Sequence, residues 1–435
     1  MSVSGVVSRV GGWITAAASC VVLVAAAGVS PSLACAGACE PVGAGEREPD
    51  VGAKPDRIAV PIAPRKPLFL SPEPQSRPAP TSDSTPDDEP SPITIESPDF
   101  RVSLSALLQF RYTASWAPAA PDSDPGVGFQ YRRLRPALRA SALDGKLKVF
   151  VQTEGAGDAE LDLLDAWWAY QLTDEWRLRV GRINLQYDRE LLTPAPYLLA
   201  VDRSALSNTL NADAANRIEG FELRYQQQHQ RVYVTVGEGL GVSGTIFNDD
   251  RSGWGVTTRY EALLVGDSFA DQFQLTAPRG TPRSLQLGVA GHIHHLDGLG
   301  ERLNATVDLT YKHDGFFAML AAGAQVGEDR NNAVFNEPEH DWGVTLASGV
   351  YVADQLELFA RGELGTTSGD VHPDLAILSA GFNYYILGQA LKFSTDASVA
   401  FNGIGPAFDR SADGFPITPD GAHRYVWRAQ IQMLF

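Results

Sequence analysis

The chain has 435 residues, 44% of them hydrophobic, a formal net charge of −17 and a pI of about 4.9. The acidic excess argues against a nucleic-acid-binding protein, which should carry a basic surface. A mean hydropathy of −0.13 excludes a chain built mainly of membrane helices. All three cysteines, Cys20, Cys35 and Cys39, stand near the start, so the main body can hold no disulfide, cysteine–zinc site or cysteine nucleophile.

Residues 1–39 show the features of a secretory signal peptide in their usual order. Arg9 is the only charged residue among them, an apolar stretch runs from Trp13 to Val29, and small residues of A-x-A type follow at 34–38. A basic start, an apolar middle and a small-residue exit indicate export from the cytoplasm. The alternative is an uncleaved membrane anchor, because the apolar stretch is long for a signal.

Residues 40–99 have the composition of a linker. They contain 14 of the chain's 28 prolines together with many acidic, Ser and Thr residues, and the stretch from Pro72 to Pro92 is almost free of apolar side chains. Such a segment cannot bury enough apolar surface to offset its ordering entropy. We therefore predict a disordered, acidic, Pro-rich spacer; the alternative is a segment that tethers the protein to other parts of the cell envelope.

From residue 100 to residue 435 the sequence alternates with a period of two. Between Arg101 and Trp116 the even positions are apolar or aromatic and most odd positions are polar, which indicates a strand with one apolar and one polar face. Asp144-Gly145 between two such runs is a strong hairpin signal. The same pattern predicts strands near 101–116, 128–143, 146–154, 162–172, 176–183, 217–226, 231–238, 253–264, 284–294, 303–313, 315–325, 342–352, 355–365, 374–386, 390–401 and 424–435.

The connections between these strands alternate in length. Short ones such as Leu143–Lys146 alternate with long ones such as Asn184–Asn216. Only Val265–Arg283 is long where a short turn is expected, so either the strands there run further or that turn carries an insertion. Short turns at one end and long loops at the other are typical of an outer-membrane barrel, and a sheet in a bilayer must close to satisfy its backbone. We therefore predict an all-β fold, a transmembrane antiparallel β-barrel of about 16 strands that follows a disordered N-terminal segment.

Aromatic residues gather at the ends of the predicted strands, as the interfacial girdles of a barrel require. They are Trp116, Trp167, Trp168, Tyr170, Trp176, Tyr311, Trp342, Tyr384, Tyr385 and Trp427. The last strand, Tyr425–Phe435, alternates in the same way and has to pair with the first strand to close the barrel. Phe435 resembles the C-terminal aromatic signal that the barrel-assembly machinery reads, so we expect that machinery to be a partner.

Two stretches make the sequence resemble the phosphate-selective porin family (porin O and P type) of Gram-negative outer membranes. One is DAWWAYQLTDEWRLRVGRINLQYDRELL, Asp165–Leu192, and the other is LSAGFNYYILGQALKFSTDASV, Leu378–Val399. The resemblance implies a sixteen-stranded, homotrimeric channel whose third loop folds into the lumen. The connection Asn184–Asn216 falls where that loop should be, so Arg189 and Arg203 are the predicted constriction-loop residues.

Several cations share the polar face of the early predicted strands, which faces the pore in a barrel. They are Arg111, Arg133, Arg135, Arg139, Lys146, Lys148, Arg177 and Arg179. Neighbouring strands lie about 5 Å apart, so these groups would form a ladder that favours anions. The alternative is the ordinary charge of a porin wall, balanced by acids across the lumen. The chain has six lysines and none in Asn184–Asn216, which departs from the phosphate-selective members.

These features predict an outer-membrane porin for passive diffusion of small hydrophilic solutes, with an anion or phosphate preference as its more specific form. Outer-membrane lipid and lipopolysaccharide are the expected surroundings. The alternative is a non-transporting barrel that acts as an envelope tether or adhesin. We expect no enzyme activity, cofactor or metal, because His292, His294 and His295 on one strand supply too few ligands and no catalytic set is persuasively placed.

Overall fold

The computed structural model describes residues 93–118, 125–155, 161–210, 217–238, 253–269, 273–296, 300–327, 339–367, 375–401, 404, 414–416 and 423–435. The predicted signal peptide, and the predicted linker up to residue 92, lie outside these residues. All of the described residues belong to one compact unit.

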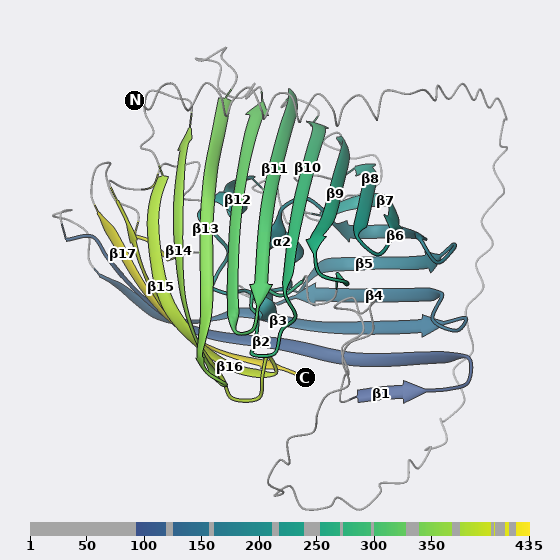
Figure 1. The fold of residues 1–435 in the computed structure, drawn as a ribbon, viewed down its shortest axis with the longest axis horizontal. Coiled ribbons are helices and arrows are strands. Elements are labelled where there is room, and N and C mark those ends of the chain that lie inside the picture. Colours follow the sequence, from purple (N-terminus) through teal and green to yellow (C-terminus); the bar gives the residue numbers. More distant parts are fainter. Residues whose placement is uncertain are drawn as a thin grey trace, which may run out of the picture. The chain divides into compact units, whose positions relative to one another are not determined.

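Sixteen antiparallel strands of the sheet make up the barrel (Figure 1). They are β2 (Phe100–Trp116), β3 (Gly126–Ala142), β4 (Leu147–Glu154), β5 (Asp162–Gln171), β6 (Trp176–Asn184), β7 (Arg217–Gln226), β8 (Gln230–Glu238), β9 (Trp254–Val265), β10 (Ser284–Leu296), β11 (Gly300–His313), β12 (Phe316–Gly327), β13 (Glu339–Ala353), β14 (Leu356–Thr367), β15 (Leu375–Tyr385), β16 (Leu391–Ala400) and β17 (Arg424–Leu434). Each predicted strand is present within a few residues of its expected bounds.

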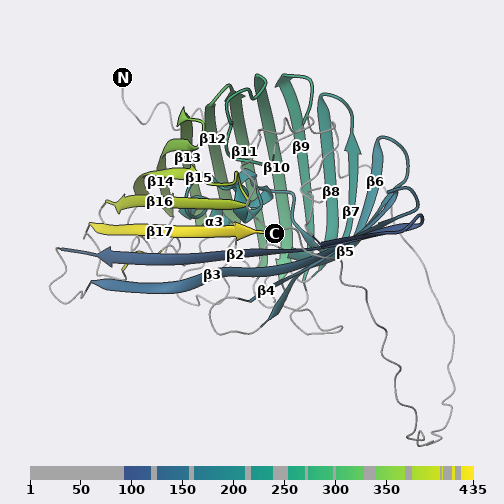
Figure 2. The same cartoon turned by 90° about the horizontal axis from the view of Figure 1, so that it is seen from below.

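The sheet closes because its last strand pairs with its first. β17 runs antiparallel to β2 in a continuous register from Tyr425 opposite Trp116 to Leu434 opposite Leu107. Figure 2 shows β17 lying beside β2. Every other strand pairs with its neighbours in sequence, including β9 with β10. The predicted closed barrel of sixteen antiparallel strands is confirmed.

Alternate side chains along each strand face the lumen and the outside, as the period of two predicts. On β2, Gln109 and Arg111 are buried on the inner face, whereas Phe110 and Tyr112 are not. The girdle prediction holds for outward residues such as Trp168, which is 42% exposed. It was wrong for Trp167 and Tyr385, which are buried. Each directly adjoins another aromatic residue of the predicted girdle, so only one of the two can face outward.

A seventeenth strand, β1 (Ile93–Glu96), lies along the same edge of β2 as β17. Ile93–Glu96 pairs with Leu104–Arg101, and the backbone of Phe435 exchanges hydrogen bonds of 2.7 and 3.1 Å with Ala106. β1 therefore continues the line of β17 where the chain ends. β1 lies within the stretch 40–99 that is predicted to be a linker, because the short run ITIE has enough β-branched character to pair.

Two other features of the chain reach into the lumen. The first is the third loop of the barrel, 185–210, which holds α2 (Arg189–Leu192), the 3₁₀ turn η2 (Ala195–Tyr197) and α3 (Ala205–Leu210). The second is the connection between β9 and β10, described at residues 266–269 and 273–283, which lies at the end of the barrel that carries the short turns. We call that end the turn end. None of the described helices is long and apolar enough to span a membrane.

Candidate functional site

The third loop begins with a capped helical turn. The side chain of Asp188 accepts a hydrogen bond from the backbone N–H of Leu191 at 3.1 Å and from the hydroxyl of Ser207 at 2.5 Å. An Asp at this position satisfies a backbone donor that the first turn of a helix leaves free. The whole of α2 is buried, so the cap fixes the direction in which the loop enters the lumen.

A buried ion cluster holds the start of the loop to the wall formed by β9 and β11. The Arg189 guanidinium lies 2.9 Å from a Glu261 oxygen and 3.0 Å from an Asp308 oxygen. Arg259 binds both of these carboxylates, at 2.9 and 2.7 Å, and also donates to the Tyr187 carbonyl. Charge-assisted hydrogen bonds of this kind are about twice as strong as neutral ones. Arg189 is therefore a clamp for the loop.

A second cluster holds the middle of the loop to β2 and β3. The Asp202 carboxylate lies 2.9 Å from Arg111, 3.0 Å from Arg132 and 3.1 Å from Arg133. Burial alone would raise the pKa of Asp202, but the three guanidinium groups, Arg132 foremost, hold it well below its ordinary value. Arg111 is fully buried in this contact. It therefore positions the loop and does not line the open path.

Backbone carbonyls and N–H groups of the loop complete its attachment on β14, β15 and β16. Lys392 donates to the Pro196 carbonyl at 2.8 Å and Asn383 to the Leu199 carbonyl at 2.8 Å. Glu363 accepts from the Ala205 N–H at 2.7 Å. Beneath these bonds the loop residues Leu198, Leu199 and Ala200 pack into one apolar cluster with residues of β12, β13, β14 and the β9–β10 connection: Leu275, Ala277, Phe317, Met319, Ala321, Ala347 and Phe359.

The β9–β10 connection reaches this cluster from the turn end. Leu275 donates its backbone N–H to the Tyr197 carbonyl at 2.9 Å, which links the two inward segments. Thr276 donates to Glu357 at 2.6 Å, and Lys312 donates to the Gln274 carbonyl at 2.6 Å. β9 ends at Val265 and β10 begins at Ser284, so the connection is not an extension of these strands. It is an insertion whose described residues fold into the lumen.

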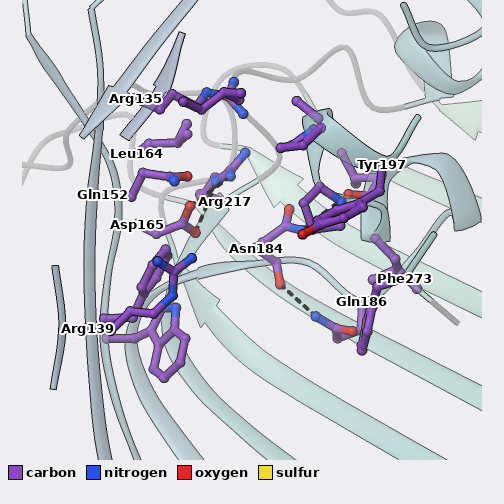
Figure 3. A pocket seen from close by; sticks show the side chains of 18 of the residues that line it. Arg135, Arg139, Gln152, Leu164, Asp165, Asn184, Gln186, Tyr197, Arg217 and Phe273 are labelled. Carbon is purple, nitrogen blue, oxygen red and sulfur yellow. Dashed lines mark hydrogen bonds and ion pairs between the residues drawn. The ribbon is translucent and has the colours of Figure 1, made fainter. Parts of the chain in front are cut away.

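The two segments leave a cavity of about 360 Å³ along the wall from β2 to β8. Nine arginines line it: Arg132, Arg133, Arg135, Arg139, Arg177, Arg179, Arg203, Arg217 and Arg224. Among the described residues around the cavity, Asp165 is the single carboxylate. Figure 3 shows Arg135, Arg139 and Asp165 on one side of the cavity, with Tyr197 and Phe273 on the other.

These arginines differ in how their charge is balanced. Arg135 pairs with Glu154, Arg179 with Glu222, and Arg217 with Asp165 at 2.9 Å. Three others are less compensated. Arg139 donates to the Ser105 hydroxyl at 2.5 Å and lies over the Phe150 ring, Arg203 donates to two loop carbonyls, and the Arg177 Nε has no hydrogen-bond partner. Burial, and then Arg135, lower the pKa of Arg203 to about 10, so it stays charged at neutral pH.

Six of the ten predicted pore and constriction cations line the cavity: Arg133, Arg135, Arg139, Arg177, Arg179 and Arg203. Arg111 and Arg189 instead hold the loop. Lys146 lies exposed in the turn between β3 and β4, because β4 begins one residue later than expected. Lys148 is on β4 but outside the cavity lining. The constriction role predicted for Arg189 does not fit its burial against Glu261 and Asp308.

Sequence reasoning missed Arg132, Arg217 and Arg224 in the cavity wall. Arg132 was missed because of a β-bulge: Gln109 pairs with Arg133 and Phe110 with Tyr131, so Arg132 is the extra residue. The bulge lets two successive arginines reach the same side, which simple alternation forbids. Arg217 and Arg224 stood in a predicted strand, and continuing the count of alternate residues along that strand would have found Arg224.

The histidines of β10 form a separate buried pair. The Nδ1 of His294 lies 3.0 Å from the Nε2 of His292, whose Nδ1 contacts the Thr257 hydroxyl at 2.7 Å. In the described part of the chain, no group of three His, Cys, Asp or Glu side chains is arranged to hold a metal ion.

The part of the chain that forms this site is similar to a known protein family. The family model of phosphate-selective porin O and P matches residues 129–292, which include the arginine wall and the third loop. This stretch of the chain is similar to the porins of that family. The match runs from β3 to β10 and includes most of the residues that line the cavity, whereas Ser105, Leu107 and Leu434 lie outside it. No curated protein matches the chain significantly.

Solved structures show the same fold at low sequence identity. An anion-selective porin from Comamonas acidovorans is 13% identical, with a TM-score of 0.54 over 78% of this chain and 100% of its own. OmpT of Vibrio cholerae, expressed in the outer membrane, is 12% identical, with a TM-score of 0.52 over 78% and 100%. The outer membrane channel DcaP of Acinetobacter baumannii is 11% identical, with a TM-score of 0.50 over 78% and 99%.

Proposed function

We propose that this outer-membrane porin prefers anions, and that its solutes diffuse along the arginine wall between β2 and β8. The observation that carries the proposal is the lining of the cavity, where nine arginines face one carboxylate among the described residues. A water-filled path lined by one sign of charge lowers the barrier for the opposite sign and offers it successive weak sites. The anion-selective character of the Comamonas acidovorans porin belongs to that protein, although its fold is the same.

The acids of the lumen do not cancel this preference. Asp202, Glu261 and Asp308 are buried and are bound to arginines that hold the third loop. Their charges are balanced within these clusters. In the described part of the chain, Arg139, Arg177 and Arg203 form no ion pair with a carboxylate, and all three line the path. The proposal therefore assigns selectivity to these three arginines above all.

The test is the zero-current potential of the purified protein in a planar bilayer that separates two KCl concentrations. Replacing Arg139 and Arg177 together by alanine should move the potential toward the cation side and lower the chloride permeability by about threefold or more, because each removes a partly exposed charge from a low-dielectric path. Arg283→Ala, an exposed arginine outside the cavity lining, is the matched control. An unchanged potential in the double variant would show that these arginines do not set the ion selectivity.

The proposal extends to the export, assembly and oligomeric state of the protein. We propose export through the signal peptide, insertion by the barrel-assembly machinery with Phe435 as its signal, contact with lipopolysaccharide, and assembly into a homotrimer. The trimer rests on the family resemblance alone. Native mass spectrometry of the detergent-extracted protein measures it directly. The alternative of a non-transporting tether or adhesin predicts no conductance in the same bilayer experiment.

A further inference from the structure

The arginine wall of the cavity also carries aromatic rings. The Arg139 guanidinium lies 5.0 Å from the centre of the Phe150 ring, and that of Arg179 lies 5.3 Å from the centre of the Trp167 ring. Phe150 and Trp167 stand opposite each other on β4 and β5, and their ring centres are 5.4 Å apart. Guanidinium groups and flat apolar faces are therefore interleaved along this wall.

The facing side of the cavity is apolar. The third loop supplies Leu191, Leu192, Pro194, Pro196 and Tyr197, and the β9–β10 connection supplies Phe273. Figure 3 places the Tyr197 and Phe273 side chains across the cavity from Arg135 and Arg139. Arg203 is the only charged residue that either inward segment adds to the described lining. A solute in this path meets guanidinium groups on one side and mostly carbon on the other.

Several buried polar atoms that line this cavity have no hydrogen-bond partner. Among them are the hydroxyl of Tyr197, a residue that is 5% exposed, and the Nε of Arg177; the others include the Nε atoms of Arg133, Arg139 and Arg179 and the Oδ1 of Asn184. A buried donor left without an acceptor is unfavourable, so such groups point to an acceptor that arrives with a ligand. Tyr197 thus offers a ring and a hydroxyl to the same solute.

The hydration of the solute decides between classes of anion. Inorganic phosphate presents oxygens on all sides and would lose water against the apolar side without gaining hydrogen bonds there. A carboxylate attached to an apolar ring places its oxygens on the guanidinium groups and its ring against Tyr197 and Phe273. The two sides of the cavity match the two ends of such a molecule.

We infer that the path favours organic carboxylates that carry an apolar ring over inorganic phosphate and over small carboxylates, with Phe273 and Tyr197 as the residues that set this preference. The inference deepens the proposed anion pore and rests on it. It requires that benzoate occupy the path longer than acetate or phosphate does, although benzoate is larger than acetate.

The experiment measures the block of single-channel chloride current by benzoate, acetate and inorganic phosphate, each added to the full-length protein in a planar bilayer. The wild-type channel should be half-blocked at a lower concentration of benzoate than of either other anion. Phe273→Ala should raise the half-blocking concentration of benzoate about fivefold, as expected for the loss of one ring contact, and leave that of acetate unchanged. Phe316→Ala, an outward phenylalanine that is 41% exposed, is the control.

Tyr197→Phe keeps the ring and removes the hydroxyl, so it should weaken the block by benzoate and by acetate to the same degree. Block by phosphate or acetate at a concentration equal to or below that of benzoate would overturn the inference, as would an unchanged benzoate block in Phe273→Ala. A channel that conducts chloride with anion selectivity but shows no benzoate preference refutes this inference alone. A channel without anion selectivity refutes the proposed function.

Discussion

Asp202 shows at the scale of a single residue how this barrel uses its charges. Its buried carboxylate binds three arginines on β2 and β3. The backbone carbonyl of Asp202 also accepts a hydrogen bond from Arg361 at 2.8 Å. A buried carboxylate without cations would be neutral, and the arginines without it would repel one another. This contact holds the third loop in place. Its loss should therefore lower the free energy of unfolding and also change the channel current.

Asp202→Asn should lower the free energy of unfolding by about 3 kcal/mol, as expected when one partner is removed from a buried ion cluster. The loosened loop should also make the channel current noisier. The measurements are urea unfolding followed by tryptophan fluorescence, and single-channel recording. Asp354→Asn, at a carboxylate that is 90% exposed in its pair with Arg279, is the matched control and should have little effect on either. A stable, quiet Asp202→Asn channel would contradict the clamp.

Asp188 gives the third loop a dependence on pH. Burial, together with the charges of Glu190 and Asp308, raises the pKa of Asp188 to about 6 from an ordinary value of 3.8. A carboxyl group with a raised pKa in the folded state stabilises that state fully below its unfolded pKa, and this contribution is lost as the pH rises through about 6. Acidification from pH 7 to pH 5 should therefore seat the loop more firmly.

Asp188→Asn keeps an oxygen that can cap α2 and removes the titration. Lowering the pH from 7 to 5 should therefore raise the unfolding temperature of the variant by less than it raises that of the wild type. Thermal unfolding at both pH values measures this difference. The same difference in both proteins would show that Asp188 does not titrate in this range.

Alternation along single strands was enough to place most of the cavity arginines. Arg133, Arg135 and Arg139 share the inner face of β3 as counted from the sequence, and Arg177 and Arg179 share that of β6. Alternation could not show that Arg111 would bind the loop carboxylate of Asp202, or that Arg189 of the loop would bind Asp308 of the wall. Those contacts join residues 91 and 119 positions apart. It also could not place the bulge at Arg132.

At the scale of elements, the sequence of β12 indicates where the inward segments pack against the barrel wall. The start of β12 reads FFAMLA from Phe316 and does not alternate. A strand that is apolar on both faces is covered on both faces. Phe317 and Met319 are in fact buried under the third loop and the β9–β10 connection, whereas Phe316 and Leu320 face outward. Such a run inside a barrel pattern predicts where an inward segment will pack.

The β9–β10 connection should act as a fixed partial plug at the turn end. Replacing residues 267–282 by a short turn should raise the single-channel conductance, because Phe273 and Leu275 would no longer narrow the lumen. The anion selectivity should persist, since the arginine wall stays in place. Planar bilayer recording of the shortened barrel measures both quantities. An unchanged conductance would show that the connection lies outside the conducting path.

At the scale of the whole molecule, the barrel distributes its charges unevenly around the lumen. The carboxylates that pair with Arg189, Arg361 and Arg428 lie on the wall from β9 to β16. Most of the arginines that line the cavity lie on the wall from β2 to β8, where Glu154, Glu222 and Asp165 pair with only three of them. The net charge of −17 therefore says little about the path a solute takes. The sequence revealed the barrel through local alternation; the uneven distribution of charge depends on which wall the inward segments cover, and this needs the closed ring.

The anion preference of this channel is measured by the sign of the zero-current potential of the wild-type protein across a tenfold KCl gradient. The arginine-lined path predicts a potential of the sign set by chloride, with a magnitude that falls as the total salt concentration rises, because salt screens charges beyond about 10 Å at 0.1 M. A potential of the sign set by potassium, or no conductance at all, would contradict the account.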